Sequence, residues 1–221
     1  MRFAVLIGIS IAPLLTGTSM ANEVNESDAA MKKSASNKIR IATFNVSMEA
    51  LNYIPYVRGV TPKVSGNELS KALASQHQQI KNIAEIIQRV NPDIILLNEF
   101  DRVGNEKNIH QSLKSFISDY LAVGQNGQTA IDFPYFYQAS SNTGLPTKLD
   151  LNNNGQVGET PQDTFGFGFF PGHFAMAFLS KYPLDEKNIR TFQQFKWKDM
   201  PDALKPIDPE TNKPWYTEQA W

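Results

Sequence analysis

The fold follows from the segment NPDIILLNEFD at residues 91–101, an apolar run that ends in two carboxylates. The four consecutive aliphatic residues from Ile94 to Leu97 are too few to cross a membrane and are typical of a strand buried on both faces. An ionised carboxylate is costly to bury without a cation or hydrogen-bond donors. We therefore expect Glu99, at the end of this strand, either to reach solvent or to face a metal ion.

A second strand is predicted upstream, near Ile39 to Val46, and it also ends in a polar side chain, Asn45. Apolar residues then recur at helical spacing from Leu69 to Val90, which predicts one helix that ends before Pro92. Two strands joined by such a helical crossover are normally parallel, so their carboxyl ends share one edge of the sheet. We expect Asn45 and Glu99 to approach each other at that edge, where α/β sheets usually bind ligands.

Further elements are predicted downstream of the first two strands. An amphipathic helix is expected over residues 109–121, a short aromatic strand over 134–138 and an apolar strand over 174–179. The remainder is aromatic and rich in turns, without the periodicity of a long helix. His77 and His110 lie on or beside apolar helical stripes, so we interpret both as packed or partly exposed histidines rather than as ligands.

Composition narrows the class of protein. The 221 residues suffice for one domain with a sizeable core, and 41% of them are hydrophobic, as in an ordinary globular protein. A net charge of -1 provides no overall positive field of the kind that draws proteins onto nucleic acid. The chain has no cysteine, which excludes disulfides, thiol catalysis and zinc–thiolate sites.

The N-terminus predicts export. Arg2 precedes an apolar segment from Phe3 to Leu15, and Ser19 and Ala21 are the small residues that a signal peptidase requires. We interpret residues 1–21 as a signal peptide and 22–37 as a flexible leader, which makes the product periplasmic or extracellular. The alternative is an uncleaved anchor. Elsewhere in the sequence, apolar runs are too short to span a membrane.

A candidate calcium loop begins at Asp150. Oxygen-bearing side chains occupy its first, third and fifth positions, and Gly155 occupies the sixth, as in the first half of a calcium-binding loop. The twelfth position is proline rather than glutamate, so other oxygens must complete the site. The candidate ligands of this possible structural Ca²⁺ are Asp150, Asn152, Asn154, Gln156, Glu159 and Asp163. A metal-free turn rich in Asn and Gly is the alternative.

His173 closes the glycine- and phenylalanine-rich segment at residues 166–172 and precedes an apolar strand. This position suits a side chain that donates to a phosphate group. It equally suits a histidine with a structural role, and the sequence leaves both interpretations open.

Three motifs together resemble the endonuclease/exonuclease/phosphatase superfamily. They are IATFNV at residues 41–46, PDIILLNE at 92–99 and MAFLSKYP at 176–183. The segments NEFD at 98–101 and WKDMP at 197–201 are most similar to a bacterial secreted branch of it. The resemblance extends over residues 39–221.

The resemblance implies a four-layer α/β/β/α sandwich and metal-dependent hydrolysis of phosphoesters. Glu99 matches the acid that binds Mg²⁺ or Mn²⁺, and Asn45 matches the asparagine that helps to hold the metal and the scissile phosphate. Asp101 is expected to support the metal site from its second shell, and Ca²⁺ in the loop at Asp150 would be structural. The substrate class stays open among nucleic acids, nucleotides, phospholipids and inositol phosphates. No protein partner is indicated, and a phosphomonoesterase of the same family is an alternative.

The sequence departs from the superfamily pattern after these motifs. A strand histidine, a Gly-Asp-x-Asn motif and a terminal Asp-His pair are expected, and this sequence contains no Gly-Asp or Asp-His dipeptide. We therefore expect residues 38–221 to form a partial domain that lacks its C-terminal part. We expect this polypeptide not to hydrolyse phosphoesters. The alternative to an enzyme is a secreted, non-catalytic binding module that calcium stabilises.

Overall fold

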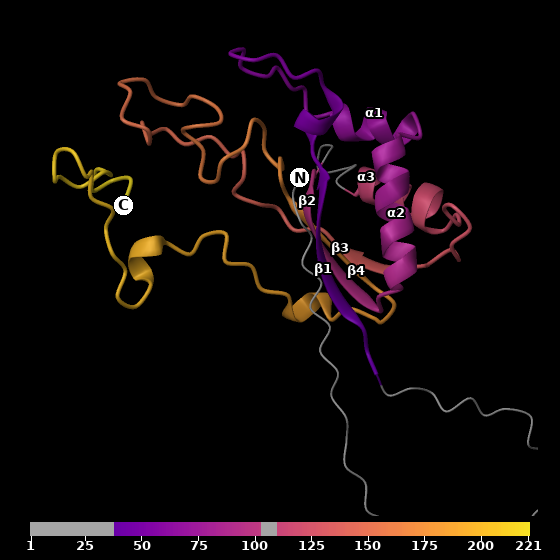
Figure 1. Cartoon of the computed structure of the whole chain (residues 1–221). Helices are drawn as coiled ribbons and strands as arrows, with labels where there is room; N and C mark the ends of the chain where they lie inside the picture. Colours follow the sequence, from indigo (N-terminus) through magenta and orange to yellow (C-terminus); the bar gives the residue numbers. More distant parts are fainter. Residues whose placement is uncertain (1–37, 103–109) are drawn as a thin grey trace, which may run out of the picture.

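The structure is a computed structural model that describes residues 38–102 and 110–221. The predicted signal peptide and leader lie outside the described residues, as does Ile109. The described chain is mixed α/β, which confirms the predicted class: a four-stranded sheet in the order β1-β2-β4-β3 has α1, α2 and α3 on one face (Figure 1).

The sheet is built around β2, Ile94–Phe100, which is a central strand. It pairs in parallel with β1, Ile41–Met48, and this confirms the predicted crossover. On its other side β2 pairs antiparallel with β4, Met176–Ser180, and β4 in turn pairs antiparallel with β3, Tyr135–Tyr137. The carboxyl ends of β1 and β2 therefore lie at the same edge of the sheet.

The prediction of one continuous helix between β1 and β2 is wrong, because the structure has two helices there. The first, α1, spans Glu68–Ala74, and the second, α2, spans Gln78–Val90. Gln76 adopts a positive φ of 56°, which a helix cannot accommodate. His77 then caps α2, because its Nδ1 accepts the backbone N–H of Gln79 at 3.3 Å. The apolar stripe continues across the break because both helices pack on the same core.

The remaining helices are short. The third helix, α3, spans Gln111–Phe116 and continues as a π-helical turn, η2, at Ile117–Leu121. The described residues also form 3-10 turns, which are η1 at Ala50–Tyr53, η3 at Glu186–Asn188 and η4 at Trp197–Asp199. Among the described residues, no helix is long and apolar enough to cross a membrane.

The hydrophobic core lies between the sheet and the helices. Alternate residues of the strands point towards the helices, and their buried members include Val46, Leu97 and Leu179. On the opposite face of the sheet, Ile41 is 61% exposed and Met176 is 53% exposed. The described residues thus form one helical layer and one sheet of the expected sandwich.

A polar cluster ties three strands together at the edge opposite the carboxyl ends of β1 and β2. Asp93 accepts the backbone N–H of Arg40 at 2.8 Å and the ammonium group of Lys181 at 3.2 Å. Lys181 also donates to the side chain of Asn91 at 2.9 Å, where α2 ends in a left-handed residue. Burial opposes ionisation of Asp93, but these donors outweigh it and hold the pKa of Asp93 below its usual value. This cluster fixes the register between β1, β2 and β4.

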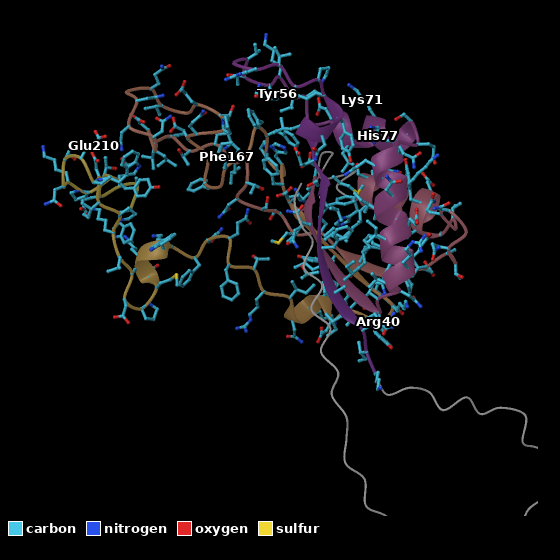
Figure 2. All side chains as sticks on the ribbon, in the orientation of Figure 1. Arg40, Tyr56, Lys71, His77, Phe167 and Glu210 are labelled. Carbon is cyan, nitrogen blue, oxygen red and sulfur yellow. The ribbon has the colours of Figure 1, made fainter. Side chains whose placement is uncertain are left out.

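The C-terminal part, residues 185–221, leaves the sheet and follows an extended path (Figure 1). Apart from η3 and η4 it is made of turns and extended segments, as the sequence predicted. It exposes several large apolar side chains, including Phe192, Trp197 and Leu204. Exposed aromatic residues also occur in the neighbouring loops, and Figure 2 labels Phe167 and Tyr56 among them.

Candidate active site

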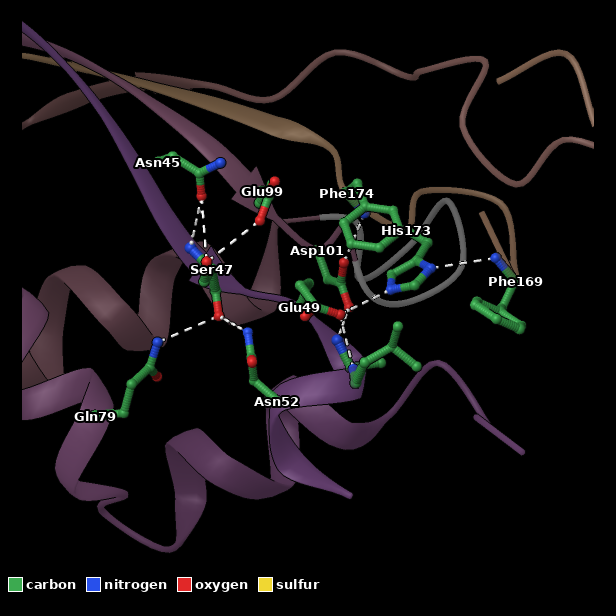
Figure 3. A network of polar contacts seen from close by, with 12 residues as sticks. Asn45, Ser47, Glu49, Asn52, Gln79, Glu99, Asp101, Phe169, His173 and Phe174 are labelled. Atoms are coloured by element: carbon green, nitrogen blue, oxygen red, sulfur yellow. Dashed lines mark hydrogen bonds and ion pairs between the residues drawn. The ribbon is translucent and has the colours of Figure 1, made fainter. Parts of the chain in front are cut away.

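The carboxyl ends of β1 and β2 bring Asn45 and Glu99 together through the side chain of Ser47 (Figure 3). Asn45 Oδ1 accepts the backbone N–H of Ser47 at 3.1 Å. The Ser47 hydroxyl lies 3.4 Å from Asn45 Oδ1 and 3.3 Å from Glu99 Oε2. The parallel crossover therefore places both residues at one edge, as the sequence predicted.

The backbone is irregular where these side chains meet. Pairing between β1 and β2 shifts register between Asn45 and Met48, which marks a β-bulge. Ser47 and Glu99 both have positive φ, 47° and 55°, although neither is glycine. Such conformations cost about 1–3 kcal/mol each and gather at functional sites, where the surrounding structure holds them. The strain is thus concentrated at the edge that carries Asn45 and Glu99.

The donor atoms at this edge suit a hard divalent cation. They are the amide oxygen of Asn45, the carboxylate of Glu99 and the hydroxyl of Ser47. Mg²⁺ prefers such oxygen ligands and usually keeps several waters or substrate oxygens in its shell. Among the described residues, His, Cys, Asp and Glu side chains do not gather in threes that could hold a metal ion. The described residues at this edge therefore offer a cation the Glu99 carboxylate together with neutral oxygens.

Asp101 follows Glu99 by two residues and lies just past the end of β2. Its side chain is buried, and its two oxygens accept the backbone N–H groups of Ala50 and Phe174 at 2.8 and 2.9 Å. Burial raises the pKa of Asp101 to about 7, against the effect of His173 and of both N–H donors. Asp101 therefore links the end of β2 to the chain after β1 and to the chain before β4.

His173 lies beneath the same edge and is 0% exposed. Its Nδ1 accepts the backbone N–H of Phe169 at 3.2 Å, so Nε2 carries the hydrogen and donates it to Glu49 Oε2 at 3.1 Å (Figure 3). Phe170 and Phe174 stack on the ring. Both ring nitrogens form hydrogen bonds within the protein. The sequence left open whether His173 donates to a phosphate or has a structural role, and this geometry favours the structural role.

The model of the endonuclease/exonuclease/phosphatase family matches residues 42–220, which include both Asn45 and Glu99. The chain belongs to the endonuclease/exonuclease/phosphatase family. Members of this family are hydrolases that act on phosphoesters as nucleases or phosphatases, and they generally depend on a divalent metal. Comparison with curated proteins and comparison with solved structures each returned no match.

The predicted calcium loop of this family member forms a compact turn. The backbone N–H of Asn154 donates to both Asp150 Oδ1 and Asn152 Oδ1, and Asn154 in turn contacts Glu159. Gln156 contributes its backbone N–H to Asn154 Oδ1 at 2.8 Å. The loop thus gathers Asp150, Asn152, Asn154 and Glu159, while calcium binding itself stays a prediction.

Asp163 supports this loop from below. It is fully buried, and its carboxylate accepts the N–H groups of Leu151 and Glu159 at 2.8 and 3.1 Å. The first of these hydrogen bonds, aided by the second, holds the pKa of Asp163 below its usual value. The structure therefore places Asp163 at the base of the turn, where it joins the two ends of the loop.

Addition of 10 mM Ca²⁺ to the full chain is expected to raise its melting temperature. A site with the Kd of extracellular calcium modules, about 10⁻⁴–10⁻³ M, would add about 1–3 kcal/mol at that concentration, and each kcal/mol corresponds to about 2–4 °C. Thermal denaturation with Ca²⁺ and with a chelator measures the shift. Asp150→Ala should abolish it, whereas Asp208→Ala, in a separate turn, should preserve it. An unchanged melting temperature of the unmodified chain would exclude the calcium loop.

Several residues at the edge were not found from the sequence. Ser47 had a usable signal, because it lies two residues after Asn45 and so on the same face of the strand. Glu49, Asn52 and Gln79 had no such signal, because their roles depend on contacts between segments far apart in the sequence. Gln79 in particular lies on the helix that packs behind the edge.

Proposed function

We propose that the chain is an exported, divalent-metal-dependent phosphoester hydrolase of the phosphodiesterase or nuclease type. The observation that carries the proposal is the meeting of Asn45, Ser47 and Glu99 at the edge shared by β1 and β2. Glu99 would supply the anionic ligand and Asn45 a neutral one. The predicted signal peptide supports export, and its cleavage product would act in the periplasm or outside the cell.

The residues have distinct roles in this proposal. A bound Mg²⁺ or Mn²⁺ supplies positive charge that stabilises the charge developing on the phosphoryl oxygens. Asn45 would orient the phosphate, and the Ser47 hydroxyl, which contacts both Asn45 Oδ1 and Glu99 Oε2, would hold these two oxygens near each other. Asp101 holds the backbone on both sides of the edge.

The polypeptide as written is proposed to have no appreciable turnover. The family pattern activates water with a histidine and its partner acid, and general base catalysis contributes about 10²–10⁴. The three histidines of the sequence are His77, His110 and His173. His77 caps a helix, His110 packs edge-on against Phe136, and His173 is buried. His173 is the histidine near the edge, and both of its ring nitrogens are engaged by Phe169 and Glu49, so its imidazole is not free to activate water.

Glu99→Gln is expected to weaken Mn²⁺ binding by more than about 100-fold, because even residues that only support a metal ligand contribute 10- to 100-fold. Titration of the full chain with Mn²⁺, followed by electron paramagnetic resonance or calorimetry, measures the affinity. Asp150→Asn is the matched control, since it removes an acid from the candidate calcium loop and leaves the sheet edge intact. If Glu99→Gln loses one Mn²⁺-binding event and Asp150→Asn loses the other, the two events are assigned to the sheet edge and to the loop.

Two results would contradict parts of this proposal. Equal Mn²⁺ affinity in the unmodified chain and in Glu99→Gln would remove Glu99 from the metal site. Hydrolysis of bis-p-nitrophenyl phosphate by the unmodified chain, lost in Glu99→Gln, would overturn the expected lack of turnover while supporting the site.

A further inference from the structure

The β-bulge at Ser47 leaves backbone carbonyl groups that the sheet does not pair. The register between β1 and β2 is regular up to Asn45 and resumes at Met48. Residues inside a bulge lose their ladder partners, and Ser47 also carries a positive φ of 47°. Other groups must therefore satisfy the carbonyl oxygens at this point and hold the conformation.

Gln79, in α2, provides these hydrogen bonds to the end of β1. Its side-chain Nε2 donates to the carbonyl oxygens of Val46 and Ser47 at 3.1 and 3.2 Å. Asn52 adds a second donor to the Ser47 carbonyl at 2.6 Å. Gln79 belongs to the first turn of α2, so the helix holds the bulge directly (Figure 3).

The orientation of the Gln79 amide is fixed by Tyr53. The Tyr53 hydroxyl donates to Gln79 Oε1 at 2.8 Å, and this forces the amide nitrogen to face the two carbonyl groups. Burial, together with the nearby Asp101 and Glu49, raises the pKa of Tyr53, so the hydroxyl keeps its hydrogen. His77 packs edge-on against the Tyr53 ring. The donor group is therefore held in one orientation.

The same residue that Gln79 holds carries the contacts to the predicted metal ligands. The N–H of Ser47 binds Asn45 Oδ1, and its hydroxyl lies against Glu99 Oε2. We propose that Gln79 is a positioning residue, which through the Ser47 bulge sets the placement of Asn45 and Glu99 for a divalent cation. The presence of a cation rests on the proposed function. The positioning role rests on the hydrogen bonds that Gln79 makes to Val46 and Ser47.

The chain offers a matched control in Gln88. This glutamine is also on α2 and is buried, and its Nε2 donates to the carbonyl oxygens of Leu121 and Val123 at 2.9 and 2.8 Å. Gln79→Met and Gln88→Met thus remove the same donor from the same helix. Only the first removal touches the Ser47 bulge, so the pair separates positioning from general stability.

Two measurements test the inference on the full chain. Amide hydrogen exchange at Ser47 reports the bulge itself, and Gln79→Met is expected to speed it about tenfold relative to the Leu97 amide in β2, with no such change in Gln88→Met. Mn²⁺ affinity is expected to fall about tenfold in Gln79→Met, within the range for groups that support a metal ligand, and to stay unchanged in Gln88→Met. Asn52→Ala, at an exposed position, should change both quantities in the same direction by a smaller factor.

The outcomes separate this inference from the proposed function. If Glu99→Gln abolishes Mn²⁺ binding and Gln79→Met leaves the affinity unchanged, the positioning role is wrong and the metal site stands. If the unmodified chain does not bind Mn²⁺ through Glu99, the proposed function fails and the positioning of metal ligands fails with it. Exchange at Ser47 then still decides whether Gln79 holds the bulge, and unchanged exchange in Gln79→Met would overturn that contact as well.

Discussion

Replacement of Asp101 with alanine is expected to lower the free energy of unfolding by about 4 kcal/mol, because each buried donor left without an acceptor costs about 1–3 kcal/mol. Asp101 is 1% exposed and accepts the N–H groups of Ala50 and Phe174. The alanine side chain satisfies neither donor. Urea denaturation followed by circular dichroism measures the loss.

The pH dependence of stability provides an independent check on Asp101. Burial is the main cause that raises its pKa to about 7 in the folded protein, whereas an unfolded aspartate titrates near pH 4. Below about pH 4 both states hold the proton, and above about pH 7 neither state does. Between these values only the folded state holds the proton. The stability that Asp101 contributes is therefore present at low pH and is lost as the pH rises, a total change of about 4 kcal/mol.

Asp101→Asn is the control for this titration, because asparagine keeps the size of the side chain and cannot lose a proton in this range. The difference in unfolding free energy between the unmodified protein and Asp101→Asn should fall steadily from pH 4 to pH 7 and then level off. Parallel pH profiles for the two proteins would show that the pKa of Asp101 is the same in the folded and the unfolded protein.

Glu49→Leu is expected to lower the free energy of unfolding by about 3 kcal/mol. Glu49 Oε2 accepts the Nε2–H of the buried His173, and it also caps η1 by accepting the N–H of Leu51 at 2.7 Å. Loss of the acceptor leaves the imidazole donor unsatisfied at a cost of about 1–3 kcal/mol, and loss of a helix cap costs about 1 kcal/mol. Chemical denaturation measures the sum.

A double-mutant cycle isolates the contact between the two side chains. His173→Leu alone should also destabilise the protein, because it removes the acceptor for the Phe169 N–H and one of the two donors to the buried Glu49 carboxylate. The double variant should lose less than the sum of the single variants, by about 1–2 kcal/mol, because the unpaired partner is absent in it. Simple additivity would show that the buried pair contributes no coupling.

The sequence predicted the parts of the fold that depend on local pattern. Four aliphatic residues before Glu99 predict a buried strand, and a crossover between two such strands fixes their parallel order and the edge that they share. From these two rules Asn45 and Glu99 were expected at one edge, and the structure places them there. The aromatic strand β3 and the apolar strand β4 were recognised from composition in the same way.

The features that the sequence did not predict depend on contacts between distant segments. The break between α1 and α2 is invisible in the apolar stripe, because both helices present the same face to one core. In the sequence, Glu49 looks like an ordinary surface acid. Its role becomes visible only in the structure, where it contacts His173, 124 residues away. Gln79 lies on a helix whose composition gives no sign that its amide reaches through to the Ser47 carbonyl.

The strand order has a consequence for the way the chain assembles. β4 is the last strand in the sequence, yet it lies between β2 and β3. The pair β1–β2 needs only residues up to 100, so it can form early, while β3 has β4 as its neighbour and must wait for it. During synthesis the sheet therefore stays incomplete until residue 180 has left the ribosome, and the Glu49–His173 contact closes at nearly the same moment. The proposed cation site, by contrast, is built from Asn45, Ser47 and Glu99 on β1 and β2, so its side chains can meet before β4 is made and the sheet is complete.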